Sequence, residues 1–116
     1  MDTFRLSGLD SLKELLASDD RDRPGVILFE SWTSQPCLDL QPRIRRLAQA
    51  MPQFAFYEFN VDDYSDPGQD KVLTRLLEEW KVTELPAQIL LPSNSRPQTL
   101  KATQVDEIRK ALQRLY

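Results

Sequence analysis

The amino-acid sequence predicts an α/β protein with a mixed sheet of four or five strands and helices on both faces. Apolar runs that suit buried strands alternate with segments of helical periodicity along most of the chain, as in sheets covered by helices. Near the end, two strand-like segments are separated only by a hairpin-length turn, which indicates an antiparallel pair. The predicted order is β-α-β-α-β-α-β-β-α, and residues 1–116 are expected to form a single domain.

The first half of the chain is expected to supply two strands and two helices. A short strand is predicted at residues 3–6, and residues 11–14 fit a capping box at the start of the first helix. Residues 26–29 are a continuous apolar run, which predicts a central strand buried on both faces. The second helix is predicted to begin near Ser34 and to run to about Met51, because apolar residues keep helical spacing there.

The second half continues the alternation. Residues 54–61 are rich in aromatics and predict a strand, and residues 66–67, Asp-Pro, supply an N-cap and first-turn proline for a third helix. Strands are predicted at residues 88–91 and 99–100, with a last helix beginning near 103–106. The apolar face of the third helix is predicted to hold Val72, Leu73, Leu76, Leu77 and Trp80.

The composition narrows the classes of function. The chain has 15 Lys plus Arg against 18 Asp plus Glu, and this net charge of -3 weighs against a nucleic-acid partner. It has no His, which rules out Ser-His and Cys-His nucleophile pairs and His-containing zinc sites. A single Cys leaves no internal disulfide and no Cys-rich metal site, so we expect neither a metal nor a cofactor.

Two further classes are disfavoured by sequence pattern. No apolar run approaches the length of a membrane span, so no membrane association is expected. Residues 1–5 show no basic stretch followed by an apolar core, and we therefore expect a cytoplasmic location. One acidic cluster lacks the spacing of a calcium loop and is interpreted as solvated strand-end and helix-cap residues: Glu58, Asp62, Asp63 and Asp66.

The segment most informative for function joins the predicted central strand to the second helix, at residues 30–37. In open α/β sheets ligands sit at the carboxyl ends of strands, and a helix N-terminus there offers free amides. Cys37, in the first turn of this helix, would have its thiolate favoured, which is how thiols become reactive. Packing is the competing interpretation, because Cys is among the most buried residue types. Ser34 likewise has a structural interpretation as the N-cap.

Four short motifs occur in an order similar to that of the thioredoxin superfamily. That family's active site reads Trp-Cys-Gly-Pro-Cys, and this chain has Phe29 and then Ser-Gln-Pro-Cys at residues 34–37. Pro42 falls where the family carries a helix-kinking proline, and residues 60–62, Asn-Val-Asp, resemble the end of its third strand. Residues 85–87, Leu-Pro-Ala, resemble its cis-proline loop. The resemblance covers nearly the whole chain and implies a thioredoxin-like fold with a cis bond before Pro86.

The departures from the family bear on function. Ser34 stands where the family has its nucleophilic Cys, and a serine hydroxyl does not attack disulfides as a thiolate does. Leu28 replaces the family's buried Asp, which assists proton transfer to the second Cys, here Cys37. Lys101 falls where the family has a Gly beside the active site, and Glu30 where a Trp is common. The resemblance thus implies that the dithiol and the carboxylate that serves it are both absent.

Two classes of function stay open. The first is a redox-inactive binding module, acting as chaperone, scaffold or subunit, with a protein or an extended peptide in the cis-Pro86 groove. Its expected binding residues are Trp32, Thr33, Ser34, Leu85, Pro86 and Lys101. The alternative is an enzyme. It would be a monothiol thiol-disulfide oxidoreductase with Cys37 as its catalytic residue, or a Cys-to-Ser variant, at Ser34, of a Cys-x-x-Cys oxidoreductase acting in cell redox homeostasis. We favour the module because three active-site features are lost together.

Overall fold

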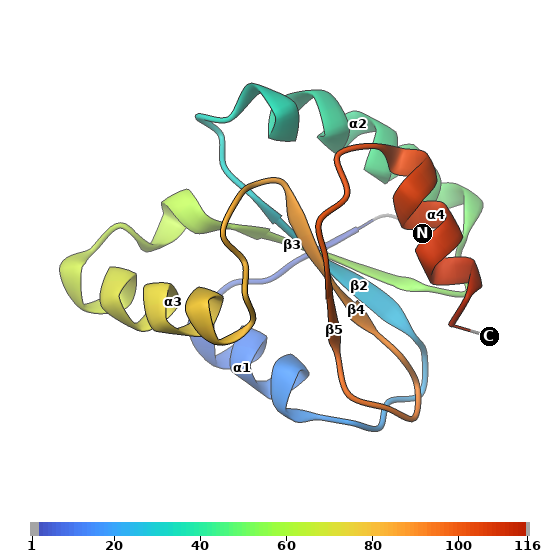
Figure 1. Ribbon diagram of the computed structural model, residues 1–116, viewed down its shortest axis with the longest axis horizontal. Helices are drawn as coiled ribbons and strands as arrows, with labels where there is room; N and C mark the ends of the chain where they lie inside the picture. The colour runs from blue at the N-terminus through green and yellow to red at the C-terminus, as the bar shows by residue number, and fades with distance from the viewer. Residues whose placement is uncertain (1–2, 116) are drawn as a thin grey trace.

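A five-stranded mixed sheet forms the centre of the protein in the computed structural model, which describes residues 3–115 (Figure 1). The strand order across the sheet is β1-β3-β2-β4-β5. The strands β1, β3 and β2 are parallel to one another, and β4 runs antiparallel to β2. The last strand, β5, runs antiparallel to β4 and therefore in the same direction as β2. The strands are β1 (Phe4–Arg5), β2 (Gly25–Glu30), β3 (Ala55–Asn60), β4 (Ala87–Leu91) and β5 (Gln98–Leu100).

Helices cover both faces of the sheet, as the alternating sequence predicts (Figure 1). The α2 helix (Gln35–Ala50) and α4 (Val105–Gln113) pack on one face. The other face is covered by α1 (Leu9–Ala17) and α3 (Pro67–Glu79), and the short 3-10 helix η1 (Val61–Tyr64) precedes α3. Two hydrophobic cores result, one on each side of the sheet. Among the described residues, no helix is long and apolar enough to cross a membrane.

The central strand β2 separates the two cores. All six of its residues are buried, and it pairs with β3 on one side and β4 on the other. Val26 and Leu28 face α2 and α4, whereas Ile27 and Phe29 face α1 and α3, which is the alternation that a pleated strand imposes. The strand begins at Gly25, where a Cβ would lie 2.1 Å from the carbonyl oxygen of Ala55, so the close pairing with β3 requires a glycine.

The structure corrects several local predictions. The first helix begins at Leu9 after Gly8, whose φ is 143°, so Ser11 lies inside the helix and the predicted capping box is wrong. On α3, Leu73 is buried and Trp80 is half-buried, as predicted, but Val72 is 37% exposed. Asp66 does cap α3, because its side chain accepts a hydrogen bond from the Gln69 amide. The errors lie at helix ends and flanks, where apolar spacing alone does not decide orientation.

Candidate functional site

The loop between β2 and α2 places Ser34 at the N-cap of α2 and Cys37 in its first turn. The Ser34 hydroxyl makes no capping hydrogen bond, although its backbone carbonyl accepts from the Leu38 amide at 3.1 Å. Its own amide donates to the carbonyl of Ser31 at 3.2 Å, which closes the loop into a tight turn. Ser34 is therefore the N-cap residue of α2, as predicted, but its hydroxyl does not bond to any free amide of the helix.

Among residues 3–115, Trp32 is the most exposed large hydrophobic side chain, with 55% of its surface accessible. Its backbone is nevertheless fixed, because the Asp62 carboxylate accepts hydrogen bonds from the Trp32 amide and the Ser31 hydroxyl, both at 2.8 Å. The Ser31 hydroxyl also lies 2.8 Å from that of Thr33. Asp62 belongs to η1, directly after β3, so two neighbouring strand ends are tied together at this edge of the sheet.

The side chain of Arg5 places a positive charge beside the Trp32 ring. The Arg5 guanidinium lies 5.5 Å from the centroid of the Trp32 ring, within the range of a cation–π contact. The same group pairs with the Asp63 carboxylate at 2.5 Å. Hydrogen bonding to Asp63 and its negative charge raise the pKa of Arg5 above its ordinary value, so the cation persists at every relevant pH. Neither Arg5 nor the role of Asp62 could be predicted from the sequence, because both contacts join residues that lie far apart in the chain.

Cys37 is 3% exposed and faces the interior. It lines a cavity of about 10 Å³ together with Glu30, Gln41, Pro86 and Gln88. The peptide bond between Leu85 and Pro86 is cis. The structure therefore brings Cys37 and Pro86 to one small space, which is about the size that one water molecule needs.

The other predicted binding residues lie in different surroundings. Leu85 is half-buried and packs against the core under α1 and α3, so only part of its side chain is accessible. Lys101 is exposed and follows Leu100, the residue of β5 that pairs with Gln88. The Gln88 side chain holds the next residue, Ala102, through two hydrogen bonds of 2.9 Å to its backbone. This clamp fixes the backbone that carries Lys101 beside the end of β4 nearest Pro86.

A pair of buried carboxyl groups lies under α2, and the sequence prediction for one of them is wrong. Glu58 was expected to be a solvated strand-end residue, yet it is only 6% exposed and Glu30 only 8%. The Gln41 side chain donates to both carboxylates, at 3.2 Å to Glu30 and 3.1 Å to Glu58. Arg45 donates to both oxygens of Glu58, and the Thr3 hydroxyl also donates to that group. The chain buries Glu58 because these donors replace water.

The two carboxyl groups differ in their tendency to ionise. Burial, followed by the negative charge of Glu58, raises the pKa of Glu30 to about 7. Burial also favours the neutral form of Glu58, but hydrogen bonds from Arg45, Thr3 and Gln41 outweigh it and lower its pKa. Glu30 thus holds a proton at slightly acidic pH while Glu58 carries the charge that pairs with Arg45.

This arrangement changes the expectation for Cys37. The apolar Leu28 implied that no buried carboxyl group would serve the thiol. The structure places the Glu30 carboxyl, two residues further along the same face of β2, at the cavity that Cys37 lines. One feature of the sequence could have indicated this buried carboxyl: Glu30 directly follows the continuous apolar run at residues 26–29. Among residues 3–115, no group of three or more Cys, Asp or Glu side chains is arranged to hold a metal ion.

Solved thioredoxin structures share the fold of this chain. Thioredoxin O1 from Arabidopsis thaliana matches with a TM-score of 0.76 at 16% identity, over 100% of this chain and 99% of that one. Thioredoxin NaTrxh from Nicotiana alata matches with a TM-score of 0.76 at 17% identity, over 97% and 91%. Mitochondrial thioredoxin 3 from Saccharomyces cerevisiae matches with a TM-score of 0.70 at 20% identity, over 97% and 94%.

Sequence comparison points the same way. A thioredoxin H-type from Fagopyrum esculentum is 28% identical over 83 residues, which is 72% of this chain. The match spans 64% of that relative's length. No protein-family model matches the sequence. The sheet order, the helices on both faces and the likeness to these structures show that the chain has the thioredoxin-superfamily fold.

Proposed function

We propose that this protein is a thioredoxin-like binding module that recognises a protein or an extended peptide and does not exchange disulfides. One observation carries the proposal: the side chains around the start of α2 divide sharply in exposure. The only thiol, Cys37, is 3% exposed, and Ser34 stands at the N-cap, whereas Trp32 between β2 and α2 is 55% exposed. The accessible chemistry of this loop is therefore aromatic and polar.

The loss of exchange chemistry follows from the number and burial of thiols. Reduction of a protein disulfide proceeds through a mixed disulfide, and a second thiol in the same protein normally resolves it. This chain has one Cys, so it has no resolving partner of its own. Attack also requires contact between the thiolate and the target sulfur, and Cys37 is covered on the inner side of α2.

The case for binding rests on how Trp32 is held. Exposed tryptophans that are fixed before binding make effective anchors, because little conformational entropy is lost when a partner covers them. The amide of Trp32 is tied to Asp62 and its ring lies under the Arg5 cation, so the side chain has a defined setting. Lys101, exposed beside the end of β4, adds a positive charge that favours acidic partner residues near Pro86.

A monothiol oxidoreductase is the second candidate, and one observation favours it. The Glu30 carboxyl lines the same cavity as Cys37, and its pKa of about 7 suits proton exchange near neutral pH. In that case an opening of α2 would have to expose Cys37, and a small thiol or a partner thiol would resolve the mixed disulfide. A cytoplasmic location stays a prediction under both candidates.

Trp32 fluorescence offers a direct test of the binding module. Replacing the other tryptophan, Trp80→Phe, leaves Trp32 as the sole indole. Titration with an array of extended peptides should then shift and quench Trp32 emission for some sequences. Trp32→Ala removes this reporter, so its affinity is measured by isothermal titration against the same peptides and should be weaker by about 2 kcal/mol. Val72→Ala is the matched control, because Val72 is exposed on α3, on the other face of the sheet.

A turnover assay separates the two candidates. With a reductase supplying electrons, reduction of a model protein disulfide should stay at the uncatalysed rate. Turnover that depends on glutathione and is abolished by Cys37→Ser would replace the binding module with the monothiol enzyme. Peptide affinities that Trp32→Ala and Val72→Ala leave equally unchanged would contradict the assigned binding surface.

A further inference from the structure

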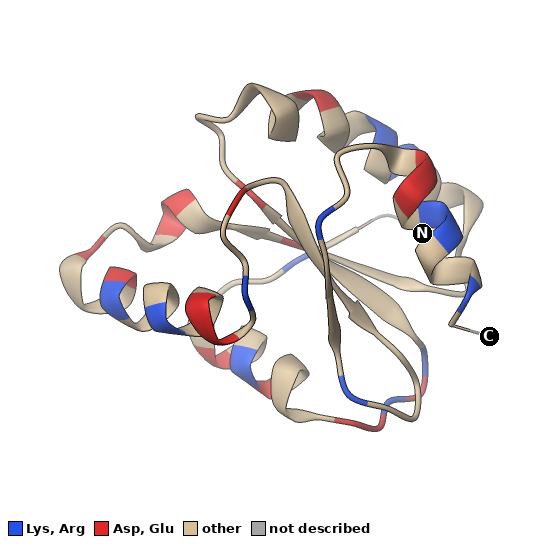
Figure 2. Cartoon of the chain, in the orientation of Figure 1, with Lys and Arg blue, Asp and Glu red and all other residues tan. Residues whose placement is uncertain are grey.

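Charge is distributed unequally over the two helical layers that cover the sheet (Figure 2). In η1, the α3 cap and α3 itself, six acidic residues stand against two basic ones, Lys71 and Arg75. The opposite layer has the reverse balance, because α2 contains three arginines and a single aspartate, Asp39. A protein of net charge -3 thus presents one acidic layer and one layer with a surplus of cations.

The surplus cations of α2 fall into two kinds. Arg45 points under the helix to the buried Glu58 and is paired there at 3.2 Å. Arg43 and Arg46 lie three residues apart on one side of the helix, both exposed, and neither forms an ion pair or hydrogen bond within residues 3–115. These two guanidiniums are available to an external anion, whereas Arg45 stabilises the fold.

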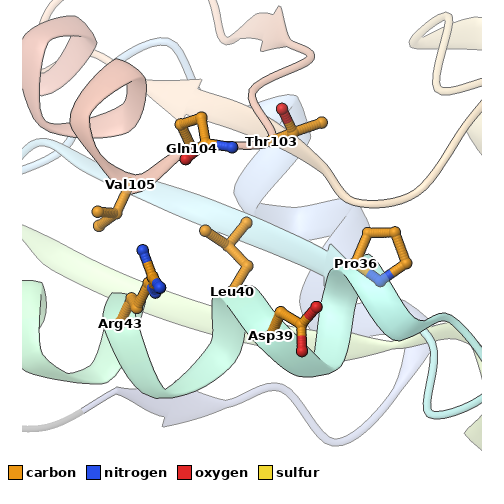
Figure 3. A pocket seen from close by; sticks show the side chains of 7 residues that line it. All are labelled: Pro36, Asp39, Leu40, Arg43, Thr103, Gln104 and Val105. Atoms are coloured by element: carbon orange, nitrogen blue, oxygen red, sulfur yellow. The ribbon is translucent and has the colours of Figure 1, made fainter.

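Both free arginines border a groove between α2 and α4 (Figure 3). Its larger part, of about 390 Å³, is lined by Pro36, Leu40 and Arg43 from α2 and by Gln104 and Val105 at the start of α4. A second concavity of about 320 Å³ continues it past Arg43 to Arg46, with Val105 shared between them. Figure 3 shows the Arg43 side chain rising from α2 toward Val105.

The groove has a charged residue toward each end and apolar residues in its lining. Asp39 lines the end nearest Pro36, and its carboxylate is occupied by a hydrogen bond of 2.8 Å from the Gln35 side chain. The two arginines define the other end. Pro36 adds apolar surface at the Asp39 end, and the half-buried Val105 adds it beside Arg43 (Figure 3). A ligand that fits this pattern presents carboxylates toward Arg43 and Arg46 and an apolar side chain toward Val105.

We propose that the groove between α2 and α4 is a second interaction surface, which docks an acidic amphipathic segment of a partner protein through Arg43 and Arg46. Guanidinium groups pair bidentately with carboxylates, and the acidic α3 layer repels such a segment from the other face, which orients the approach. A nucleic acid fits less well, because two arginines neutralise few phosphates and the net charge is negative. This surface is independent of the Trp32 site.

The test uses a labelled synthetic peptide of Glu-Glu-Leu repeats and the same peptide with glutamine in place of glutamate. Fluorescence anisotropy should show binding of the acidic peptide that weakens as salt is raised, and little binding of the glutamine peptide. The double variant Arg43→Glu, Arg46→Glu should bind the acidic peptide at least about tenfold more weakly. Arg75→Glu changes the charge of α3 in the same direction and should stay within about twofold.

Wild-type protein supplies a readout that does not depend on a variant's folding. Amide and arginine side-chain resonances of Arg43, Arg46, Gln104 and Val105 should shift on adding the acidic peptide. Equal affinity for both peptides, an undiminished affinity in the double variant, or shifts confined to α3 would overturn the proposal. Displacement of the peptide by an oligonucleotide at lower concentration would assign the groove to nucleic acid instead. Trp32→Ala should leave this affinity unchanged, so the result does not depend on the proposed function.

Discussion

Trp32 and Cys37 lie five positions apart in the same junction between β2 and α2, yet their surroundings differ in almost every respect. Trp32 is exposed, and polar contacts to Asp62 and Arg5 hold it at the surface. Cys37 is buried beside a carboxyl group whose charge the interior disfavours. The difference shows that one strand-to-helix junction can expose an aromatic side chain to a partner while it buries its only thiol. The two residues are placed by different elements: the first turn of α2 turns Cys37 toward the core, whereas Trp32 lies in the loop before the helix, where Asp62 binds its amide.

The largest effect is expected from a second thiol at the start of α2, because both thiols needed for disulfide exchange would then be present. Ser34→Cys places a thiol at the N-cap, where the helix dipole and free amides stabilise a thiolate, within one turn of Cys37. We expect disulfide reduction about a hundredfold above that of the wild type, since attack and resolution then both become available. The measurement is turnover of a model protein disulfide with a reductase.

Two further variants show how proton transfer limits that gained activity. Adding Glu30→Gln to Ser34→Cys should slow the reaction, because the carboxyl at the Cys37 cavity is lost. Adding Leu28→Asp should speed it, at a cost in stability for another buried carboxyl. Equal rates in all three proteins would show that no neighbouring carboxyl takes part.

The buried side can be probed through its pH dependence. The pKa of Glu30 is raised from 4.5 to about 7 in the folded protein, so folding loses stability as pH rises across that interval. Glu30→Gln keeps an acceptor for Gln41 and offers Glu58 a donor, as the protonated Glu30 carboxyl does when its hydrogen bond with Glu58 raises its pKa. We expect the variant to be about 2 kcal/mol more stable than the wild type at pH 8 and equal to it near pH 4.

Urea unfolding at a series of pH values measures this difference. The stability curves of the two proteins should converge below pH 4.5 and separate most above pH 7. A constant offset at every pH would mean that the variant changes packing and that Glu30 ionises in the folded state as it does in water. Glu58→Gln is the informative contrast, because it removes the partner of Arg45 and should destabilise the protein near neutral pH.

The exposed side depends on Asp62, and removing its carboxylate should have a smaller effect. Asp62→Ala deletes the acceptor of the Trp32 amide and the Ser31 hydroxyl, so the loop should become mobile. We expect a loss of about 1 kcal/mol in stability and a similar loss in peptide affinity. Hydrogen exchange of the Trp32 amide checks the cause, since it should accelerate in the variant while amides in β2 keep their protection.

The smallest expected effect concerns the cation beside Trp32. Arg5→Leu keeps apolar contact with the ring and removes the charge that lies 5.5 Å from its centroid. Exposed cation–π contacts contribute about 0.5–1 kcal/mol, so peptide affinity should fall by that amount or less. Isothermal titration against the peptides that bind the wild type is the measurement. An increase in affinity would mean that Arg5 shields Trp32 from its partner.

Much of the fold is determined by sequence pattern alone. The apolar run that ends at Phe29 and the aromatic-rich segment that ends at Asn60 both predict buried strands, which are β2 and β3. The Asp66-Pro67 pair predicts the start of α3. The position of Ser34 at the start of α2 and the place of Cys37 in its first turn also follow from local signals. Such features depend on contacts within a few residues, which is why the sequence determines them.

Only the tertiary structure decided what surrounds those residues. Arg5 reaches Trp32 because β1 and β2 both pair with β3. Glu58 is buried because Thr3, just before β1, and Gln41 and Arg45 of α2 converge on it from two separate segments. From sequence alone, a charged side chain at the end of a strand is predicted to be exposed to solvent, because the donors that could bind it are not known. Burial of a carboxyl depends on whether distant donors replace its water, and that balance is settled only when the sheet and helices assemble.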